Sequence, residues 1–516
     1  MLGDIHEGKQ VVHPIFDAFS IVLQLQNLYA GLIGVFVGTL TGVLPGLGPV
    51  GAMALLFPVA IGMDSAMALI MLTGVYYGAM YGGSTTSILL NIPGESASVV
   101  TCIDGYRMAR KGRAGAALAV AAVGSFVAGT LGTIALMYLA PPLARIAVRF
   151  GPPEFFAIAF FGLLVLSTLS SGSLLKSWAM IVLGLMLGTF GIDVLSGAQR
   201  ITYGTQFLMR GIDFIPVIMG VYGITEVLCL AEELSAGAVH VIKVKFRDLF
   251  PTKEEWKRSA PPILRGSFVG FFAGLIPGPA TVIASFAAYA VEKKFSRHRK
   301  ELGTGAIEGV AGPESANNSA TSGAMVPLLA LGVPFSPAAA MLLGALLVHG
   351  VIPGPMLAKE HPQLLWTVIA SMYTGNFLLL LLNYPMVGLF ANVLRVPARI
   401  IAPFILIFCI LGAYSVNNSV MDIQLMVIFG LVGYVMRKGG YDAAPLVLAI
   451  VLGPMMESSL RQSFISSQGD PLILITRPIS GTILGFGSVV LLWQLIKRIL
   501  RKASRPPKLA TEDADA

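Results

Sequence analysis

The sequence predicts an all-α polytopic membrane protein with about 10–12 transmembrane helices, together with re-entrant or broken helices in two inverted repeats. Three observations lead to this fold class. The composition is 55% hydrophobic and only 12% charged, and the mean hydropathy is +0.79. Several uncharged stretches exceed the roughly 20 residues that a helix needs to cross a bilayer. Finally, glycine–proline motifs recur in two distant parts of the chain.

The uncharged stretches run from end to end, at 19–63, 114–140, 155–175, 363–394, 400–421 and 478–496. The segment 1–19 mixes acidic residues, a lysine and two histidines, so it lacks the basic-then-apolar pattern of a cleaved signal peptide. We therefore expect the first span to act as the insertion signal. The three cysteines are scattered through apolar sequence, which favours core thiols over a disulfide framework.

Many basic residues lie in four clusters, at 107–113, 243–258, 293–300 and 497–508. These clusters lie between or after the apolar stretches, so the net charge of +8 is explained by orientation in the lipid bilayer rather than by nucleic acid. The positive-inside rule places all four clusters, and the C-terminus, in the cytoplasm. The polar residues 501–516 predict a disordered tail.

Two distant segments match each other. Residues 34–46 and 266–278 agree at seven of thirteen positions, including three glycines spaced by four and a final Pro-Gly. The quartet STTS at 84–87 follows Gly46 at nearly the same distance at which the quartet SATS at 319–322 follows Gly278. Together these matches predict an internal duplication. The predicted parts are an N-terminal segment (1–19), a first repeat (20–235), a basic cytoplasmic linker (236–261) and a second repeat (262–500).

The two repeats are expected to face opposite ways. Segment 266–278 follows the basic linker, whereas segment 34–46 follows an N-terminus with little positive excess. Opposite orientation is the inverted-repeat arrangement of secondary transporters. Segment 266–291 has basic residues on both sides, which favours a re-entrant hairpin, with 34–60 as its mirror image. One proline-kinked span in each repeat remains the alternative.

The stretch GLGPVG at 46–51 has the G-x-G-x-x-G spacing of a dinucleotide-binding turn, but it lies inside apolar sequence and no acidic residue follows on a second strand. Its glycines and prolines predict a helix break at membrane depth, which persists only where it is buried in protein or lines a polar cavity. Freed N–H groups attract anions and freed carbonyls attract cations. The predicted break residues are Pro45, Pro49, Pro277 and Pro279, and the glycines expected to bind substrate are Gly46, Gly48 and Gly278. A plain helix kink is the alternative.

Two polar stretches beside these motifs are the other candidates for substrate binding. In the first repeat the residues are Ser84, Thr85, Thr86, Ser87 and Asn91. In the second repeat they are Asn317, Asn318, Ser319, Thr321 and Ser322. Hydroxyl and amide groups offer uncharged hydrogen bonds to carboxylate oxygens or to a dehydrated Na⁺. The alternative is that they join helices, as serine and threonine commonly do in membranes.

Glu95 and Glu314 flank the polar stretches and are the candidates for coupling to a cation, Na⁺ or H⁺. A position at the membrane interface is the alternative for each, because a charge in mid-bilayer is costly. We expect no metal and no other cofactor. The six histidines are dispersed, and no nucleophile-elbow, zinc-protease or P-loop motif is present, so no enzymatic activity is expected.

Four long stretches resemble the large membrane subunit of the tripartite tricarboxylate transporter (TTT) family. They are GVLPGLGPVGAMALLFP, YYGAMYGGSTTSILLNIPGE, GFFAGLIPGPATVIASFAAYAVEKK and GPESANNSATSGAMVPLLALGVP, and the similarity covers about residues 20–500. The resemblance implies a bacterial inner-membrane carrier of citrate-like tricarboxylates or other organic acids, driven by an ion gradient. It also implies two partners, a small membrane subunit and a periplasmic substrate-binding protein.

The sequence thus predicts the translocating subunit of a secondary carboxylate transporter that works by alternating access. An anion channel is the main alternative. A membrane-embedded transferase would need a catalytic acid–base group, which the sequence does not offer.

Overall fold

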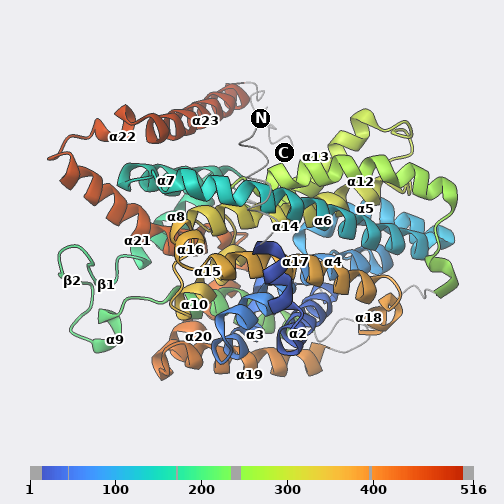
Figure 1. Cartoon of the computed structure of the whole chain (residues 1–516), viewed down its shortest axis with the longest axis horizontal. Helices are drawn as coiled ribbons and strands as arrows, with labels where there is room; N and C mark the ends of the chain where they lie inside the picture. The colour runs from blue at the N-terminus through green and yellow to red at the C-terminus, as the bar shows by residue number, and fades with distance from the viewer. Residues whose placement is uncertain (1–13, 45, 170–172, 234–245, 394–397, 504–516) are drawn as a thin grey trace, which may run out of the picture.

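The computed structural model describes residues 14–503 except 45, 170–172, 234–245 and 394–397 (Figure 1). Nearly all of the described chain is helical, and its only strands are the two short ones, β1 and β2. Within these residues, eight helices are long and apolar enough to cross a membrane, and shorter apolar helices accompany them. The predicted all-α polytopic fold is confirmed.

The helices form two runs along the chain, one on each side of residues 234–245. The first run consists of α2 (Leu25–Val43), α3 (Gly48–Ile61), α4 (Ser65–Leu90), η1 (Ser96–Ser98), α5 (Val99–Met108), η2 (Ala109–Arg113), α6 (Ala114–Ala147), α7 (Pro152–Leu169), α8 (Leu174–Leu187), α9 (Gln206–Met209), α10 (Phe214–Ile218), η3 (Met219–Ile224) and α11 (Thr225–Glu233). The second run consists of η4 (Phe246–Leu249), α12 (Lys253–Gly274), α13 (Ala280–Phe295), α14 (Glu308–Leu331), α15 (Pro337–Val348), α16 (Pro355–Glu360), α17 (Pro362–Asn383), α18 (Val387–Val393), α19 (Ala398–Asn417), α20 (Val420–Lys438), α21 (Ala443–Ser466), α22 (Ile473–Thr476) and α23 (Pro478–Ala503).

The segments expected to lie outside the membrane repeats are partly helical. Residues 14–19 of the N-terminal segment belong to a helix that continues to residue 22, while 1–13 lie outside the described residues. The predicted linker 236–261 contributes its last part to α12, which starts at Lys253 behind a Thr252 cap. Of the predicted tail 501–516, α23 includes the first three residues and 504–516 lie outside the described part.

Both Pro-Gly motifs interrupt the helical path. The chain leaves α2 at Val43 and enters α3 at Gly48, and it leaves α12 at Gly274 and enters α13 at Ala280. Gly46 (φ 98°) and Gly278 (φ 126°) have backbone angles that favour glycine. Pro49 and Pro279 stand at the starts of α3 and α13, where a missing N–H is tolerated. Pro277 is buried in protein, and Pro45 lies outside the described residues.

Glycine stripes let two helix pairs approach closely. On α2 and α12, glycines recur every four residues, and a Cβ at any of them would overlap the backbone of the facing helix. The contacts are Gly34 with Met71, Gly38 with Val75 and Gly42 with Ala79 on α4, and Gly266 with Gly312, Gly270 with Ala316 and Gly274 with Ala320 on α14. Small residues of this kind drive helix association in membranes, where lipid removes the hydrophobic contrast.

The glycine contacts give an alignment of α4 with α14, and this alignment differs from the one inferred from the serine–threonine quartets. Gly82 packs on Thr39 and Gly42, and Gly323 packs in the same way on Phe271 and Gly274. The same offset along the chain relates the left-handed C-caps of α4 and α14, Asn91 (φ 60°) and Gly332 (φ 73°). In this alignment residues 84–87 correspond to 325–328, so pairing them with 319–322 was wrong by six positions.

The two helices that contain the polar stretches, α4 and α14, form the centre of the molecule. Every residue from Ala68 to Leu89 on α4 and from Glu308 to Ala330 on α14 is buried. α14 packs against α12, α13 and α6, while α4 packs against α2, α3 and α17, and Figure 1 shows α14 in the middle of the bundle. The hydroxyl and amide groups of these helices are therefore enclosed by protein rather than by lipid.

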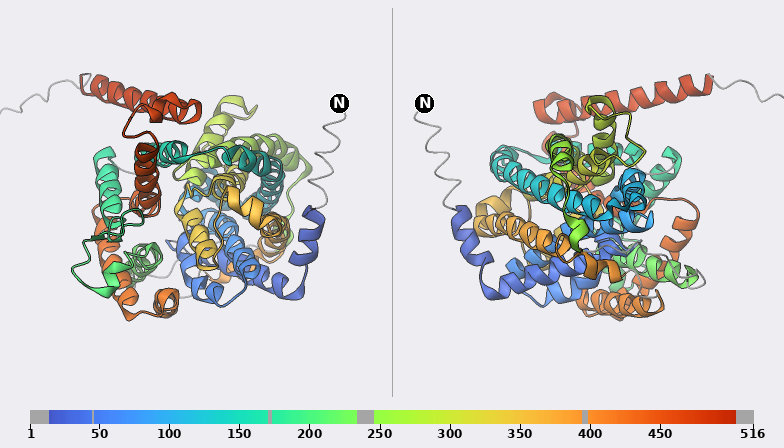
Figure 2. Two further views of the ribbon diagram at one scale, coloured as in Figure 1. Left: turned by 60° about the vertical axis from the view of Figure 1, so that its left-hand side comes forward. Right: turned by 90° about the vertical axis from the view of Figure 1, so that its right-hand side faces the viewer.

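The periphery is apolar and exposed. α19 carries outward Phe404, Ile407 and Leu411, each at least half exposed, which gives a surface suited to lipid. α23 lies along one edge of the molecule, apart from the helices that surround α14 (Figure 2). These outer helices enclose no part of the polar centre.

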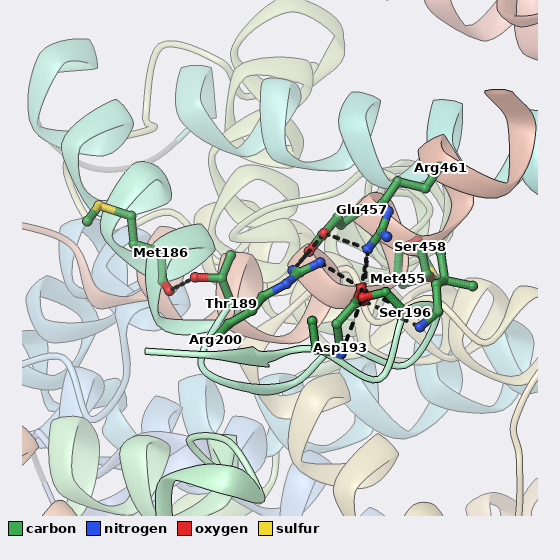
Figure 3. A network of polar contacts seen from close by, with 11 residues as sticks. Met186, Thr189, Asp193, Ser196, Arg200, Met455, Glu457, Ser458 and Arg461 are labelled. Carbon is green, nitrogen blue, oxygen red and sulfur yellow. Dashed lines mark hydrogen bonds and ion pairs between the residues drawn. The ribbon is translucent and has the colours of Figure 1, made fainter. Parts of the chain in front are cut away.

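A hairpin outside the long helices is held by ion pairs. β1 (Gly191–Ile192) and β2 (Gln199–Arg200) pair antiparallel. Between them Asp193 contacts Arg461 (2.7 Å) and Arg200 (3.1 Å), and Arg200 also contacts Glu457 (2.7 Å), as Figure 3 shows. The Ser196 hydroxyl and the Arg461 guanidinium keep the pKa of Asp193 well below its usual range. The network ties the loop to α21.

Gly270→Ala is expected to destabilise the protein. The added Cβ must push α12 away from the Ala316 backbone, which has no side-chain freedom to yield, at a cost of about 1–3 kcal/mol. Thermal unfolding of the purified full-length protein in detergent should show a lower midpoint. Gly485→Ala on α23 is the matched control, because a Cβ there meets nothing within 4 Å. Equal midpoints for both variants would contradict the proposed role of the stripe.

Asp193→Asn is expected to release the hairpin. Because the folded-state pKa lies below the unfolded one, the contribution of the carboxylate is fully present above about pH 4 and is lost as the pH falls through the folded-state value. Hydrogen–deuterium exchange of residues 191–200 should therefore be slow and equally protected at pH 6 and 7 in the wild type. It should be faster in the variant. Asp470→Asn, which removes the charge of a carboxylate in a different loop, should leave this exchange unchanged.

Candidate binding site between two buried helices

Two buried carboxyl groups meet the polar face of α14. Asn317 donates from Nδ2 to Glu95 Oε1 (3.2 Å), and Glu95 lies in the turn between α4 and η1. Thr101 on α5 donates its hydroxyl to Glu314 Oε1. Both contacts join residues of the second helical run to residues of the first. The two glutamates that flank the polar stretches in the sequence are therefore neighbours in the fold and are buried inside it.

The next turn of α14 faces α6. Asn318 donates from Nδ2 to Ser125 Oγ (2.7 Å) and to its own helix at the Glu314 carbonyl (3.1 Å). One turn further on, Ser322 and Thr133 bring their hydroxyls to 3.5 Å. The remaining hydroxyls bond to backbone: Ser319 donates to Ser267 O on α12, and Thr321 donates to Asn318 O. These two act as ordinary helix contacts.

The polar residues of α4 point partly to the same place. Ser84 donates to the Tyr81 carbonyl and also lies beside the Glu314 carboxyl. Ser87 donates to Gly83 O, and its hydroxyl lies close to Cys102 on α5. Thr86 bonds to Val43 O (2.5 Å), the carbonyl at which α2 ends, so it satisfies a group that the helix break leaves free. Thr85 is buried with them.

Several buried polar atoms of α14 have no hydrogen-bond partner within the described part of the chain. They are Glu314 Oε2, Ser315 Oγ, Asn317 Oδ1 and Asn318 Oδ1, and each residue is at most 1% exposed. Spacings of three and four residues place Glu314, Asn317 and Asn318 on one face of the helix. Leaving such a group unpaired costs about 1–3 kcal/mol. A stretch that keeps several of them together is therefore a candidate binding site.

Other buried acidic residues have local partners. The ion pairs are Glu154 with Arg477, Glu226 with Arg437, Glu292 with Arg265, and Glu308 with Arg258. Asp104 accepts from three backbone N–H groups, those of Gly303, Gly305 and Ala306, and from the Tyr289 hydroxyl. Near the start of α20, the Asp422 carboxylate accepts a hydrogen bond from the Asn417 side chain. Among the described residues, neither Glu95 nor Glu314 forms an ion pair.

Several of the predicted site residues lie elsewhere. Gly46 is exposed and packs against the Glu226 carboxylate, and Gly48 meets no neighbour where a Cβ would stand. Gly278 is buried against apolar side chains of α7, and its N–H donates to the Phe335 carbonyl (2.9 Å). Asn91 is exposed at the end of α4 in the left-handed conformation. The helix breaks therefore position the polar helices without contributing their own glycines to the polar cluster.

Several polar partners were missed in the sequence. Thr101 follows the serines of segment 96–98, just after the first polar stretch, and Ser125 stands alone in an apolar helical stretch. Asn376 lies in the apolar helix α17, where it accepts from Tyr81 on α4 (2.6 Å) and donates to the Phe126 carbonyl (2.8 Å). An amide in the middle of an uncharged membrane helix was the available signal for Asn376. No such signal distinguishes the isolated hydroxyls from ordinary helix contacts.

The arrangement is rich in acceptors and suited to binding rather than to catalysis. Within the described residues, no three His, Cys, Asp or Glu side chains converge to hold a metal ion. The unpartnered atoms are carboxylate, amide and hydroxyl oxygens, which suit hard cations and hydrogen-bond donors. A hydroxyl can turn from a backbone carbonyl toward a ligand, so Ser84 and Ser87 can also donate to a carboxylate. Such a site can hold small polar ligands away from lipid.

Known proteins are similar to this chain over most of its length. The model of the Tripartite tricarboxylate transporter TctA family matches residues 28–448. An uncharacterized 52.8 kDa protein in the TAR-I ttuC′ 3′ region of Agrobacterium vitis is 45% identical over 487 residues, which are 94% of this chain and 97% of that protein. An uncharacterized protein in the TAR-II ttuC′ 3′ region of the same organism is 45% identical over 233 residues, 45% of this chain and 96% of that protein. No solved structure matches the chain.

Proposed function

The chain belongs to the tripartite tricarboxylate transporter TctA family, and from this membership we propose that it is the translocating subunit of an ion-gradient-driven, binding-protein-dependent secondary transporter. Its substrate would be a citrate-like tricarboxylate or another organic acid. The observation that carries the proposal is the group of buried, unpartnered oxygens on α14, at the junction of the two helical runs. A carrier needs such a polar place inside an otherwise apolar bundle.

The polar faces of α4 and α14 would bind the substrate. Ser84 and Ser87 on α4, with Asn317 and Asn318 on α14, supply uncharged hydrogen-bonding groups inside the protein. Residues 46–48 and 277–279 would act as the bends that let the halves of each broken helix tilt.

The two glycine-striped pairs would be the inverted repeats of an alternating-access carrier. Each repeat would contain, in chain order, a glycine-striped helix, a Pro-Gly break, a second helix and a buried polar helix. The striped helix contacts the polar helix through equivalent glycines in both. α6 of the first run packs on α14, whereas α17 of the second run packs on α4, so each polar helix is covered from the other half. Motion of one half against the other would open the polar centre to one side at a time.

The remaining features of the proposal follow from the family. A small membrane subunit and a periplasmic substrate-binding protein would complete the transporter in the bacterial inner membrane, with the C-terminus in the cytoplasm. Na⁺ or H⁺ would drive uptake, and no other cofactor would be needed. The chain would act as a carrier and not as an enzyme.

Ser87→Ala and Asn318→Ala are expected to reduce carboxylate uptake without lowering expression. For Ser87 the change removes one hydrogen bond to the charged substrate, about 1.5–3 kcal/mol, which should lower uptake at subsaturating substrate by about tenfold or more. For Asn318 it removes the amide that holds Ser125 and the polar face of α14 together, so uptake should fall as well. Uptake would be measured in proteoliposomes that contain the small subunit, with the binding protein added, across a panel of carboxylates. Ser415→Ala on α19 is the matched control, because it removes the same kind of bond to a carbonyl one turn back.

Two results would count against this assignment. Uptake unchanged in both variants would remove Ser87 and Asn318 from the site. Steady single-channel current without counterflow would favour an anion channel over a carrier.

A further inference from the structure

The unpartnered atoms around Glu95 and Glu314 share one chemical property. Glu314 Oε2, Asn317 Oδ1 and Asn318 Oδ1 are all acceptors, and the fourth atom, Ser315 Oγ, can accept as well as donate, while Asn317 Nδ2 and Asn318 Nδ2 already donate to protein oxygens. The missing partner must therefore supply donors or positive charge. An anion bound to these atoms would leave them unsatisfied.

The charge balance points the same way. Glu292, the acid that packs against Gly312 just before Glu314, is neutralised by Arg265 at 2.6 Å. Asp104 is held by backbone N–H groups, but no lysine or arginine among the described residues pairs with Glu95 or Glu314. If both carboxyl groups are ionised, they place two uncompensated negative charges inside the bundle. A buried charge is retained only with a compensating partner.

We propose that Glu95, Glu314, Asn317 and Asn318 hold one monovalent cation, Na⁺ or a proton, between α14 and the η1–α5 segment, and that this cation must bind before the carboxylate does. The inference rests on the proposed transport function and assigns the coupling step to one site. Oxygen ligands from carboxylate and amide groups are those that a hard cation prefers. Like charges a few ångströms apart in partly buried surroundings weaken binding by roughly tenfold to a thousandfold, so the empty site repels the substrate.

The ligands come from both helical runs, which gives the cation a mechanical effect. Glu95 is fixed by its own turn, where it accepts from Ala97 N (2.6 Å), and Glu314 belongs to the rigid, fully buried α14. A cation between them draws the α4–α5 turn toward α14. The neighbouring titratable or charged groups are Tyr76 on α4, Cys102 and Asp104 on α5, Tyr289 and Glu292 on α13, and Arg265 on α12.

The first test measures cation binding by the purified full-length chain without any carboxylate. Thermal midpoints would be recorded against NaCl, with choline chloride at equal ionic strength, and separately against pH at fixed Na⁺. A saturable Na⁺ effect identifies Na⁺, whereas a pH effect without a Na⁺ effect identifies the proton. If Na⁺ is the bound ion, Glu314→Gln and Asn318→Ala should raise the Na⁺ concentration that gives half of the thermal stabilisation at least tenfold. If the proton is the bound ion, Glu314→Gln should abolish the pH dependence of the thermal midpoint. Asn27→Ala is the matched control, because Asn27 Oδ1 is also buried and unpartnered but lies on α2, with no carboxyl group bonded to it.

The second test measures order of binding in the reconstituted transporter. Wild-type uptake should require the cation, and the double variant Glu95→Gln/Glu314→Gln should lose that requirement. Should the double variant misfold, Thr101→Val, which removes only the hydroxyl bonded to Glu314, should still shift the cation concentration that gives half-maximal uptake.

The failures of the two proposals are distinguishable. Carboxylate uptake whose Na⁺ and pH dependence is the same in all variants would overturn the cation site and leave the transport function intact. Cation binding that depends on Glu314, together with no uptake of any carboxylate by the complete transporter, would overturn the transport function and keep the site.

Discussion

The close backbone approach of the glycine-striped helices to α4 and α14 is the constraint on which the rest of the structure depends. Six glycines at four-residue spacing leave room only for the facing backbone. In lipid no hydrophobic force holds polar helices together, so van der Waals packing of small residues must do so. This packing encloses α4 and α14 on all sides, and only then can both helices carry hydroxyl, amide and carboxyl groups without exposing them to hydrocarbon.

The enclosed polar groups divide into two kinds. Thr86, Ser319 and Thr321 satisfy backbone carbonyls, and Asp104 anchors the loop before α14 through three N–H groups. These contacts complete themselves and need no ligand. The stretch 314–318 is different, because its acceptors find no partner, and the two carboxyl groups beside them find no counter-charge, among the residues that the structure describes. This contrast within one helix locates the candidate site more sharply than polarity alone.

The sequence predicted the fold class and both helix interruptions because composition, proline and glycine act locally. It also placed Glu95 and Glu314 beside the polar stretches, although the two lie in different halves of the chain and their meeting depends on tertiary packing. The register of the repeats could not be read from the serine–threonine quartets, since four short polar residues match too easily, whereas the contacts of Gly82 and Gly323 are set by backbone geometry. Gly278 was misjudged for a related reason: a bend supplies free N–H groups, but here Phe335 takes the one at the corner.

Within the residues that the structure describes, Glu95 and Glu314 have no lysine or arginine partner, and this also bears on how a carrier of the proposed kind would reset. A fixed arginine would attract a carboxylate, but it would remain as an uncompensated charge inside the bundle whenever the carrier returned empty. In the proposed cycle a bound cation would provide the positive charge only while the substrate needs it. Neutral serine and asparagine groups would then suffice at the site, and departure of the cation would restore the repulsion that releases the substrate. Two acids with no counter-charge in the described part of the chain would thus serve a cycle that a permanent cation would obstruct.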